Sequence, residues 1–89
     1  MDLADIKDVS IFAPLVGSQF QIEIDEEQVV AAELVEAAQA SGDSFSLLFA
    51  VKDGIDLPQR IYRVSHEELG EVRLFMVPLG GGRLESVFN

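Results

Sequence analysis

The sequence contains no cysteine and no tryptophan, and only six of its 89 residues are lysine or arginine. Without cysteine, the chain cannot form a disulfide scaffold, a zinc finger, an iron–sulfur site or a thiol-dependent active site. Sixteen acidic residues give a formal charge of −10. Nucleic acids are usually bound by clustered lysine and arginine, so this charge argues against a nucleic-acid partner.

Long apolar runs are also missing. No stretch approaches the ~20 apolar residues that a membrane helix needs, and the negative charge opposes binding to anionic lipid surfaces. The chain starts with acidic rather than basic residues, so the sequence does not indicate a secretory leader. We expect a cytoplasmic protein without membrane insertion, which can still assemble into a larger particle.

The length and the 48% apolar composition suit one folded domain with a single core. We interpret residues 1–11 as an N-terminal arm and residues 12–89 as a single β domain. Ser10 is a candidate cap for a short helical turn over residues 11–13, and Gly17 is expected to end this turn.

Alternating apolar and polar residues predict several short strands. These lie near residues 20–24, 44–51, 61–64, 72–76 and 83–88. Pro78 is expected to end the fourth of them, because proline cannot donate to a ladder. Strands at this spacing predict an all-β fold, a small antiparallel barrel or sandwich of five to seven short strands.

The segment at residues 28–40 is ambiguous. Its alanine, leucine and glutamate favour a helix, yet its apolar positions match neither a helical stripe nor a clean alternation. It lies between two predicted strands, and a strand here would complete an antiparallel meander with short connections. We favour a strand, with a helix as the alternative.

Several short motifs follow one another along residues 12–89. They are FAPLVGSQF at 12–20, FSLLF at 45–49, YRVSH at 62–66, LG at 69–70, LFMVPLG at 74–80 and VFN at 87–89. Together they resemble a family of short bacterial proteins described as a domain of unknown function. The resemblance implies a small β-rich domain and supplies no catalytic residues. It also implies a loose association with genes for phage-tail-collar-like and surface-assembly proteins.

His66, Glu67 and Glu68 are a candidate site for a divalent metal, because imidazole and carboxylate groups are common ligands. Adjacent residues on a strand point to opposite faces, however, so a further ligand would have to come from elsewhere. The alternative is structural: His66 ends a strand and hydrogen-bonds a backbone group, and Ser65 caps a turn with Glu68.

Two other motifs have weaker functional interpretations. Residues 25–27, Asp-Glu-Glu, could bind calcium, but they lack the spacing of a calcium loop and are typical of a solvated turn. The three glycines at residues 80–82 lack the Gly-Lys-Ser/Thr ending of a phosphate loop and are typical of a mobile hairpin tip. No serine lies in a Gly-x-Ser-x-Gly elbow, so we expect no enzymatic activity, and no cofactor is implied.

Leu48, Phe75 and Val77 are apolar on strand faces opposite to the predicted core residues. A strand that is apolar on both faces is buried on both sides or meets a partner. The alternative is that the barrel or the N-terminal arm covers these residues. We expect a non-enzymatic structural or assembly protein that acts through protein–protein contacts or self-association. A small module that binds a ligand or a divalent metal is the second hypothesis.

Overall fold

The computed structural model describes residues 9–40, 42 and 44–88 of the chain. Within these residues, two short 3-10 helices precede six β-strands. The helices are η2 (Val9–Ile11) and η3 (Ala13–Leu15), and the strands are β1 (Gln19–Glu23), β2 (Val29–Gln39), β3 (Phe45–Val51), β4 (Arg60–His66), β5 (Gly70–Gly80) and β6 (Arg83–Phe88).

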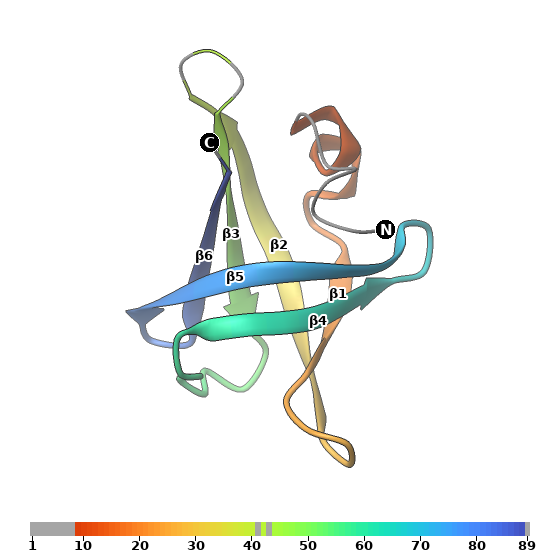
Figure 1. The fold of residues 1–89 in the computed structure, drawn as a ribbon, viewed down its shortest axis with the longest axis vertical. Helices are drawn as coiled ribbons and strands as arrows, with labels where there is room; N and C mark the ends of the chain where they lie inside the picture. The colour runs from red at the N-terminus through yellow and green to blue at the C-terminus, as the bar shows by residue number, and fades with distance from the viewer. Residues whose placement is uncertain (1–8, 41, 43, 89) are drawn as a thin grey trace.

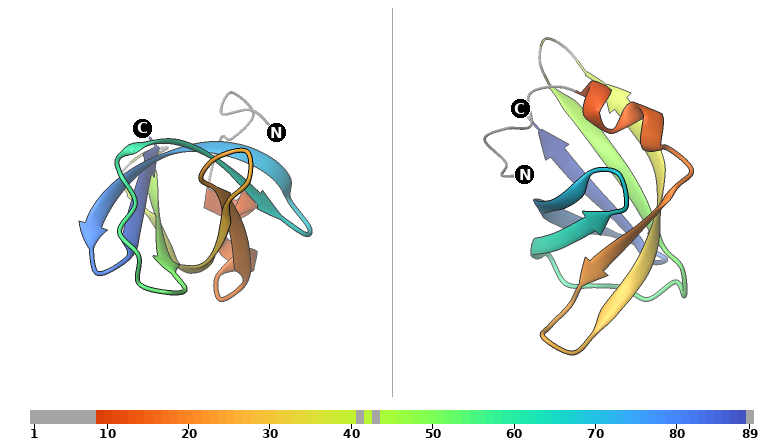
Figure 2. Two further views of the ribbon diagram at one scale, coloured as in Figure 1. Left: turned by 90° about the horizontal axis from the view of Figure 1, so that it is seen from below. Right: turned by 90° about the vertical axis from the view of Figure 1, so that its right-hand side faces the viewer.

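The strands form a closed antiparallel barrel in the order β1-β2-β3-β6-β5-β4, and β4 pairs with β1 to close the ring. β4 and β5 cross in front of the other strands in Figure 1. The two views of Figure 2 place β4 and β5 on the opposite side of the barrel from β2 and β3. The predicted all-β class is confirmed, and of the two predicted architectures the barrel is the correct one.

The alanine-rich segment at residues 28–40 contains strand β2, as favoured from the sequence. β2 pairs with β1 along one edge and with β3 along the other, so its backbone groups are satisfied by the two ladders. The register with β3 shifts between Leu34 and Glu36, and both Val35 and Glu36 are exposed. This β-bulge explains why the apolar positions of the segment do not alternate cleanly.

Inward-pointing residues from all six strands fill the barrel. Along β3, buried and half-buried residues alternate over the whole strand, as expected where one face lines the core. A small barrel of this kind has a packed interior, and burial of its apolar side chains is the main stabilising contribution. The buried apolar residues of the strands are Phe20, Ile22, Ala32, Leu34, Phe45, Leu47, Phe49, Val51, Tyr62, Val64, Val72, Leu74, Met76 and Leu84.

The two 3-10 helices pack against one end of the barrel. Phe12, between them, is fully buried, with its ring centroid 6.2 Å from that of Phe45 and 6.3 Å from that of Phe88. The predicted helical turn is therefore present, although Ser10 lies inside it instead of capping it. The rest of the predicted arm, residues 1–8, lies outside the described residues, and neither described helix is long enough to cross a membrane.

The glycine turn between β5 and β6 packs against the β3–β4 loop. Its three glycines all have positive φ, between 62° and 93°, which suits glycine far better than other residues. Gly82 is buried, and its N–H donates to Asp56 Oδ1 at 2.8 Å. A Cβ at Gly82 would lie 2.6 Å from the Cα of Gly54. The predicted hairpin tip is present, but these contacts fasten it to the barrel.

The expectation that Pro78 ends its strand is wrong, because β5 continues to Gly80. The ladder between β5 and β4 finishes at Met76, so no strand requires the missing N–H of Pro78 on that side. On the other side Pro78 lies opposite Leu84, next to a register shift in the ladder with β6. Proline is tolerated at such irregular positions.

Candidate interaction surface

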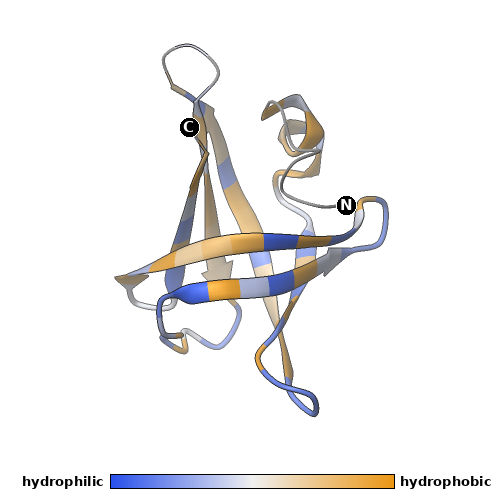
Figure 3. Ribbon diagram, viewed as in Figure 1, coloured by the Kyte–Doolittle hydropathy of each residue, from blue (hydrophilic) through white to orange (hydrophobic). Residues whose placement is uncertain are grey.

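The outer face of β4 and β5 carries exposed apolar side chains. Ile61 on β4 lies directly opposite Phe75 on β5, and the exposed fractions of these residues are 57% and 45%. Residues directly opposite each other on one face of a ladder are in contact distance. Figure 3 shows the same two strands at the front, with a largely hydrophobic β5 beside its glycine turn. The two side chains therefore form a continuous apolar area in solvent.

Of the other two predicted interface residues, Val77 lies beside this pair and Leu48 lies farther round the barrel, on β3. Val77 is on the same face of β5 as Phe75, and Leu48 on β3 faces the same side of the sheet as Glu85. Glu85 of β6 is opposite both Leu48 and Val77, so the three form one row across three strands. Val77 and Leu48 are half-buried. Phe75 and Val77 therefore share the outer face of β5, whereas Leu48 lies two strands away on β3, on the far side of Glu85.

Ile61 was not among the residues predicted from the sequence. The sequence predicts a strand at residues 61–64 but does not by itself show which face of the strand Ile61 is on. The structure shows that Tyr62 and Val64 point inward, so the apolar Ile61 must point outward. An apolar residue at an outward position was the signal that could have identified it.

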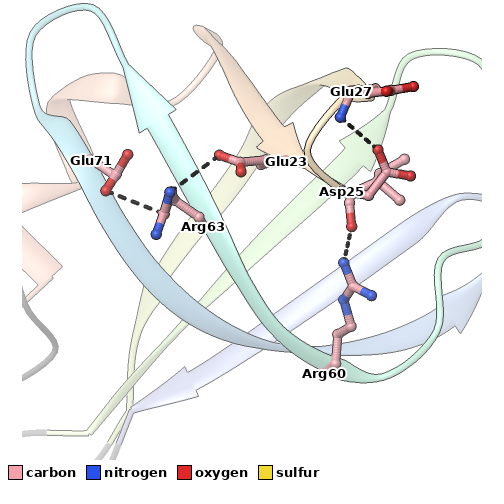
Figure 4. Close-up of polar contacts among 7 residues, drawn as sticks. Glu23, Asp25, Glu27, Arg60, Arg63 and Glu71 are labelled. Atoms are coloured by element: carbon pink, nitrogen blue, oxygen red, sulfur yellow. Dashed lines mark hydrogen bonds and ion pairs between the residues drawn. The ribbon is translucent and has the colours of Figure 1, made fainter.

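Arginines surround the apolar pair. Arg63 lies opposite Arg73 in the β4–β5 ladder. On their strands, these arginines are the next outward-pointing residues after Ile61 and Phe75 respectively. Two carboxylates neutralise Arg63: Glu71 Oε1 is 3.4 Å from its Nε, and Glu23 Oε2 is 3.8 Å from its Nη1, as Figure 4 shows. Within the described residues, Arg73 forms no ion pair. Unlike Arg63, Arg73 therefore has no neighbouring carboxylate that compensates its charge within the described residues.

A depression of about 600 Å³ lies next to these arginines, between the β1–β2 turn and β4. Arg60 reaches across it, and its Nη2 donates to the backbone oxygen of Ile24. The guanidinium carbon of Arg60 also lies 4.6 Å from the centroid of the Tyr62 ring, in a cation–π contact. The acidic side of the depression is the exposed turn at Asp25, where the Glu27 N–H donates to Asp25 Oδ1 at 2.8 Å.

Tyr62 is almost fully buried beneath Arg60, with an exposed fraction of 1%. Its hydroxyl donates to the backbone oxygen of Pro58. Burial raises the pKa of the Tyr62 phenol above its usual value, and the positive charge of Arg60 partly offsets this rise. The phenol therefore stays neutral and keeps its hydrogen bond at physiological pH.

His66 takes part in a local hydrogen-bond network. Its Nδ1 accepts from the backbone N–H of Glu68 at 3.0 Å, and its Nε2 lies 2.9 Å from Ser18 Oγ. In a neutral ring whose Nδ1 accepts, the proton is on Nε2, so Nε2 donates to Ser18. The Ser18 hydroxyl in turn donates to the backbone oxygen of Leu15. The structural alternative for His66, a strand end bound to a backbone group, is confirmed.

This direction of donation does not suit a nucleophilic serine. In a catalytic pair, the histidine must accept the serine proton, whereas His66 donates to Ser18. Ser65, the predicted turn cap, lies inside β4. Glu67 and Glu68 are exposed, and within residues 9–40, 42 and 44–88 no group of three or more histidine, aspartate or glutamate residues is placed to hold a metal. The network fastens the segment before β1 to the end of β4.

Comparison with known proteins gives one match. No curated protein and no solved structure matches the chain. The model of a domain-of-unknown-function family, DUF6916, matches residues 8–88, which include the whole barrel and the outer face of β4 and β5. The chain therefore belongs to the DUF6916 family.

Proposed function

We propose that this protein is a non-enzymatic assembly component that binds another protein chain through the outer face of β4 and β5. The observation that carries the proposal is the pair of exposed, directly opposed side chains Ile61 and Phe75. The barrel interior is filled by inward-pointing residues, so the fold does not need this pair for its core. Exposed apolar groups that lie together often mark a protein-binding site.

The surroundings of the pair support a protein partner. Val77 extends the apolar surface along β5, and Arg63 and Arg73 provide charged groups beside it. An apolar centre with a polar rim is the usual anatomy of a protein interface, and aromatic and arginine residues are enriched there. The resemblance described above suggests a phage-tail-like or surface assembly as the setting.

The test is the molar mass in solution of the wild type and of Phe75→Glu, by size-exclusion chromatography with light scattering across a concentration series. We expect the wild type to exceed the mass of one 9.7 kDa chain, or to purify with a partner from the cells that make it. Phe75→Glu should lose this association because a buried, unpaired carboxylate is costly at an interface.

Ile55→Glu is the matched control. Ile55 lies in the β3–β4 loop and has nearly the same exposure as Phe75, 46% against 45%. It should associate like the wild type, and thermal melting should show both variants folded. The proposal would be rejected if Phe75→Glu were folded and associated as well as Ile55→Glu does. It would also be rejected if both Phe75→Glu and Phe75→Ala failed to fold, because Phe75 would then belong to the core.

A further inference from the structure

His66 is the only histidine of the chain, and it lies where the end of β4 meets the segment before β1. Its side chain is half-buried, and the centroid of its ring lies 4.5 Å from that of Phe20, a fully buried residue of β1. The turn at residues 67–69 follows directly and leads from β4 into β5. The His66 ring therefore contacts the barrel on one side and this turn on the other.

The contact with the turn depends on the protonation state of the ring. The backbone N–H of Glu68 can only donate, so His66 Nδ1, which is 3.0 Å away, must offer a lone pair. An imidazolium carries a proton on both nitrogens and accepts no hydrogen bond. The arrangement seen in the structure is therefore available only to the neutral ring.

The same hydrogen bond closes the β4–β5 turn. It has the pattern of an Asx turn, in which a side chain accepts from the backbone N–H two residues later. Leu69, the next residue, is half-buried and packs against the hydrophobic core. Gly70 then pairs with His66 as the first residue of β5 in the ladder. The turn is thus held at its base by the ladder and at Glu68 by the His66 ring.

The other ring nitrogen responds differently to a proton. Nε2 donates to Ser18 Oγ in the neutral ring, and it is still a donor in the imidazolium. Two backbone hydrogen bonds also hold this segment: the Gly17 N–H donates to the Leu34 oxygen at 2.7 Å, and the Leu34 N–H donates to the Ser18 oxygen at 3.1 Å. A proton on Nδ1 therefore breaks the contact with the turn and preserves the contact with Ser18.

The charged groups around the ring belong to the turn and to β5. Glu67 and Glu68 are exposed, and Glu67 lines the same depression as His66. β1 contributes amide side chains and a phenyl ring, which do not titrate. On β5, the Glu71 carboxylate is in an ion pair with Arg63. Histidine is the side chain that ordinarily gains a proton as the pH falls from about 8 to about 5.

We propose that His66 is a proton-sensitive latch of the β4–β5 turn. The neutral ring holds the Glu68 N–H and keeps the turn closed. When Nδ1 gains a proton, two N–H groups point at each other, the turn opens and Leu69 loses its packing against the core, whereas Ser18 stays in place. This inference goes beyond the proposed function and does not depend on it, because the interaction surface on the outer face of β4 and β5 lies outside this network.

The test is a titration of the full chain from about pH 8 to about pH 5, followed by NMR. His66 gives a single set of imidazole signals because the chain has no other histidine. At high pH, its nitrogen signals should show a ring protonated on Nε2 and not on Nδ1. The amide proton of Glu68 should shift with the same midpoint as the ring, whereas the amide protons of Gly17 and Leu34 should not follow it.

His66→Asn is the matched control. The side-chain oxygen of asparagine accepts from the same backbone N–H and does not titrate, so this turn should stay closed at every pH. At low pH, the Glu68 amide of the wild type should exchange with water about 2- to 10-fold faster than that of His66→Asn, the factor expected for the loss of one hydrogen bond. The variant with Glu67→Gln and Glu68→Gln should retain the transition, which separates the ring from its neighbouring carboxylates.

Three results would overturn the latch. One is a high-pH ring that carries its proton on Nδ1, and another is a Glu68 amide that does not follow the ring. The third is a His66→Asn variant that shows the same transition as the wild type. The titration of the wild type alone decides the first two, so the inference can be refuted even if a variant fails to fold.

Discussion

Strand β5 presents two rows of side chains with different roles. Val72, Leu74 and Met76 point into the barrel and have exposed fractions of 1% or less. Arg73 and Phe75 alternate with them and are exposed. The inner row completes a core to which every strand contributes, whereas the outer row adds apolar surface that the core does not use. The comparison teaches that one strand separates, residue by residue, the side chains that stabilise the core from the side chains that the proposed association would use.

Closure of the barrel limits how a partner can bind. Each strand has a neighbour on both sides, so no strand lies at the edge of an open sheet. Strand addition, which needs such an edge, is therefore disfavoured. A partner of the kind proposed above would instead contact side chains on the outside of the barrel, such as the outer row of β5. Substitutions in the outer row therefore test the proposed function, and substitutions in the inner row test the fold.

The largest expected effect separates the two rows directly. Leu74→Ala should lower the free energy of unfolding by about 2–5 kcal/mol, because it removes a fully buried side chain and leaves a cavity. Phe75→Ala, one residue later, should cost no more than about 1 kcal/mol because its ring is partly in solvent. Urea unfolding measures both. Equal losses would mean that Phe75 belongs to the core.

Much of the fold was predictable because apolar residues recur at every second position of several segments. Phe45, Leu47 and Phe49 are an example, and such a pattern indicates a strand with one face in the core. The segment at residues 28–40 was harder, since its bulge interrupts the alternation and its alanines favour a helix. Pairing with β1 and β3 outweighs that local preference.

The surface was only partly predictable. Phe75, Val77 and Leu48 were identified because each interrupts an alternating pattern with an apolar residue. Other features depend on distant parts of the chain meeting in space. Ser18 and His66 are 48 residues apart in sequence, and the contact of Gly82 with Gly54 joins two separate turns. No local pattern indicates either, because closure of the barrel creates them.

A second prediction concerns the inner row of β4. Because burial raises the pKa of the Tyr62 phenol, the folded protein should keep its proton at pH values where the unfolded chain, with a phenol pKa of about 10, has lost it. The contribution of this phenol to the free energy of unfolding is complete below the unfolded pKa of about 10 and is lost as the pH rises through the folded pKa. The loss is about 1.4 kcal/mol for each pKa unit by which the folded value exceeds the unfolded value.

Tyr62 is the only tyrosine and the chain has no tryptophan, so ultraviolet absorbance of the phenolate reports this residue alone. Its midpoint in the folded protein should lie above that measured in urea. Arg60→Gln should raise the midpoint further, because the Arg60 charge favours the phenolate. Equal midpoints in folded and unfolded protein would show that the ring is not shielded from solvent.

The smallest effects are expected at the arginines of the outer row. Arg63 and Arg73 lie opposite each other, and like charges in a ladder destabilise it. Arg73→Gln should therefore raise the free energy of unfolding by a few tenths of a kcal/mol, on the order of 0.2–0.5. Arg63→Gln should lower it by a similar amount, since exposed ion pairs with Glu23 and Glu71 contribute little. Urea unfolding of both single variants and of the double variant measures the coupling energy between Arg63 and Arg73.

A loss of several kcal/mol for Arg73→Gln would show that Arg73 stabilises the fold. A small change, as expected here, would show that the fold does not depend on its charge.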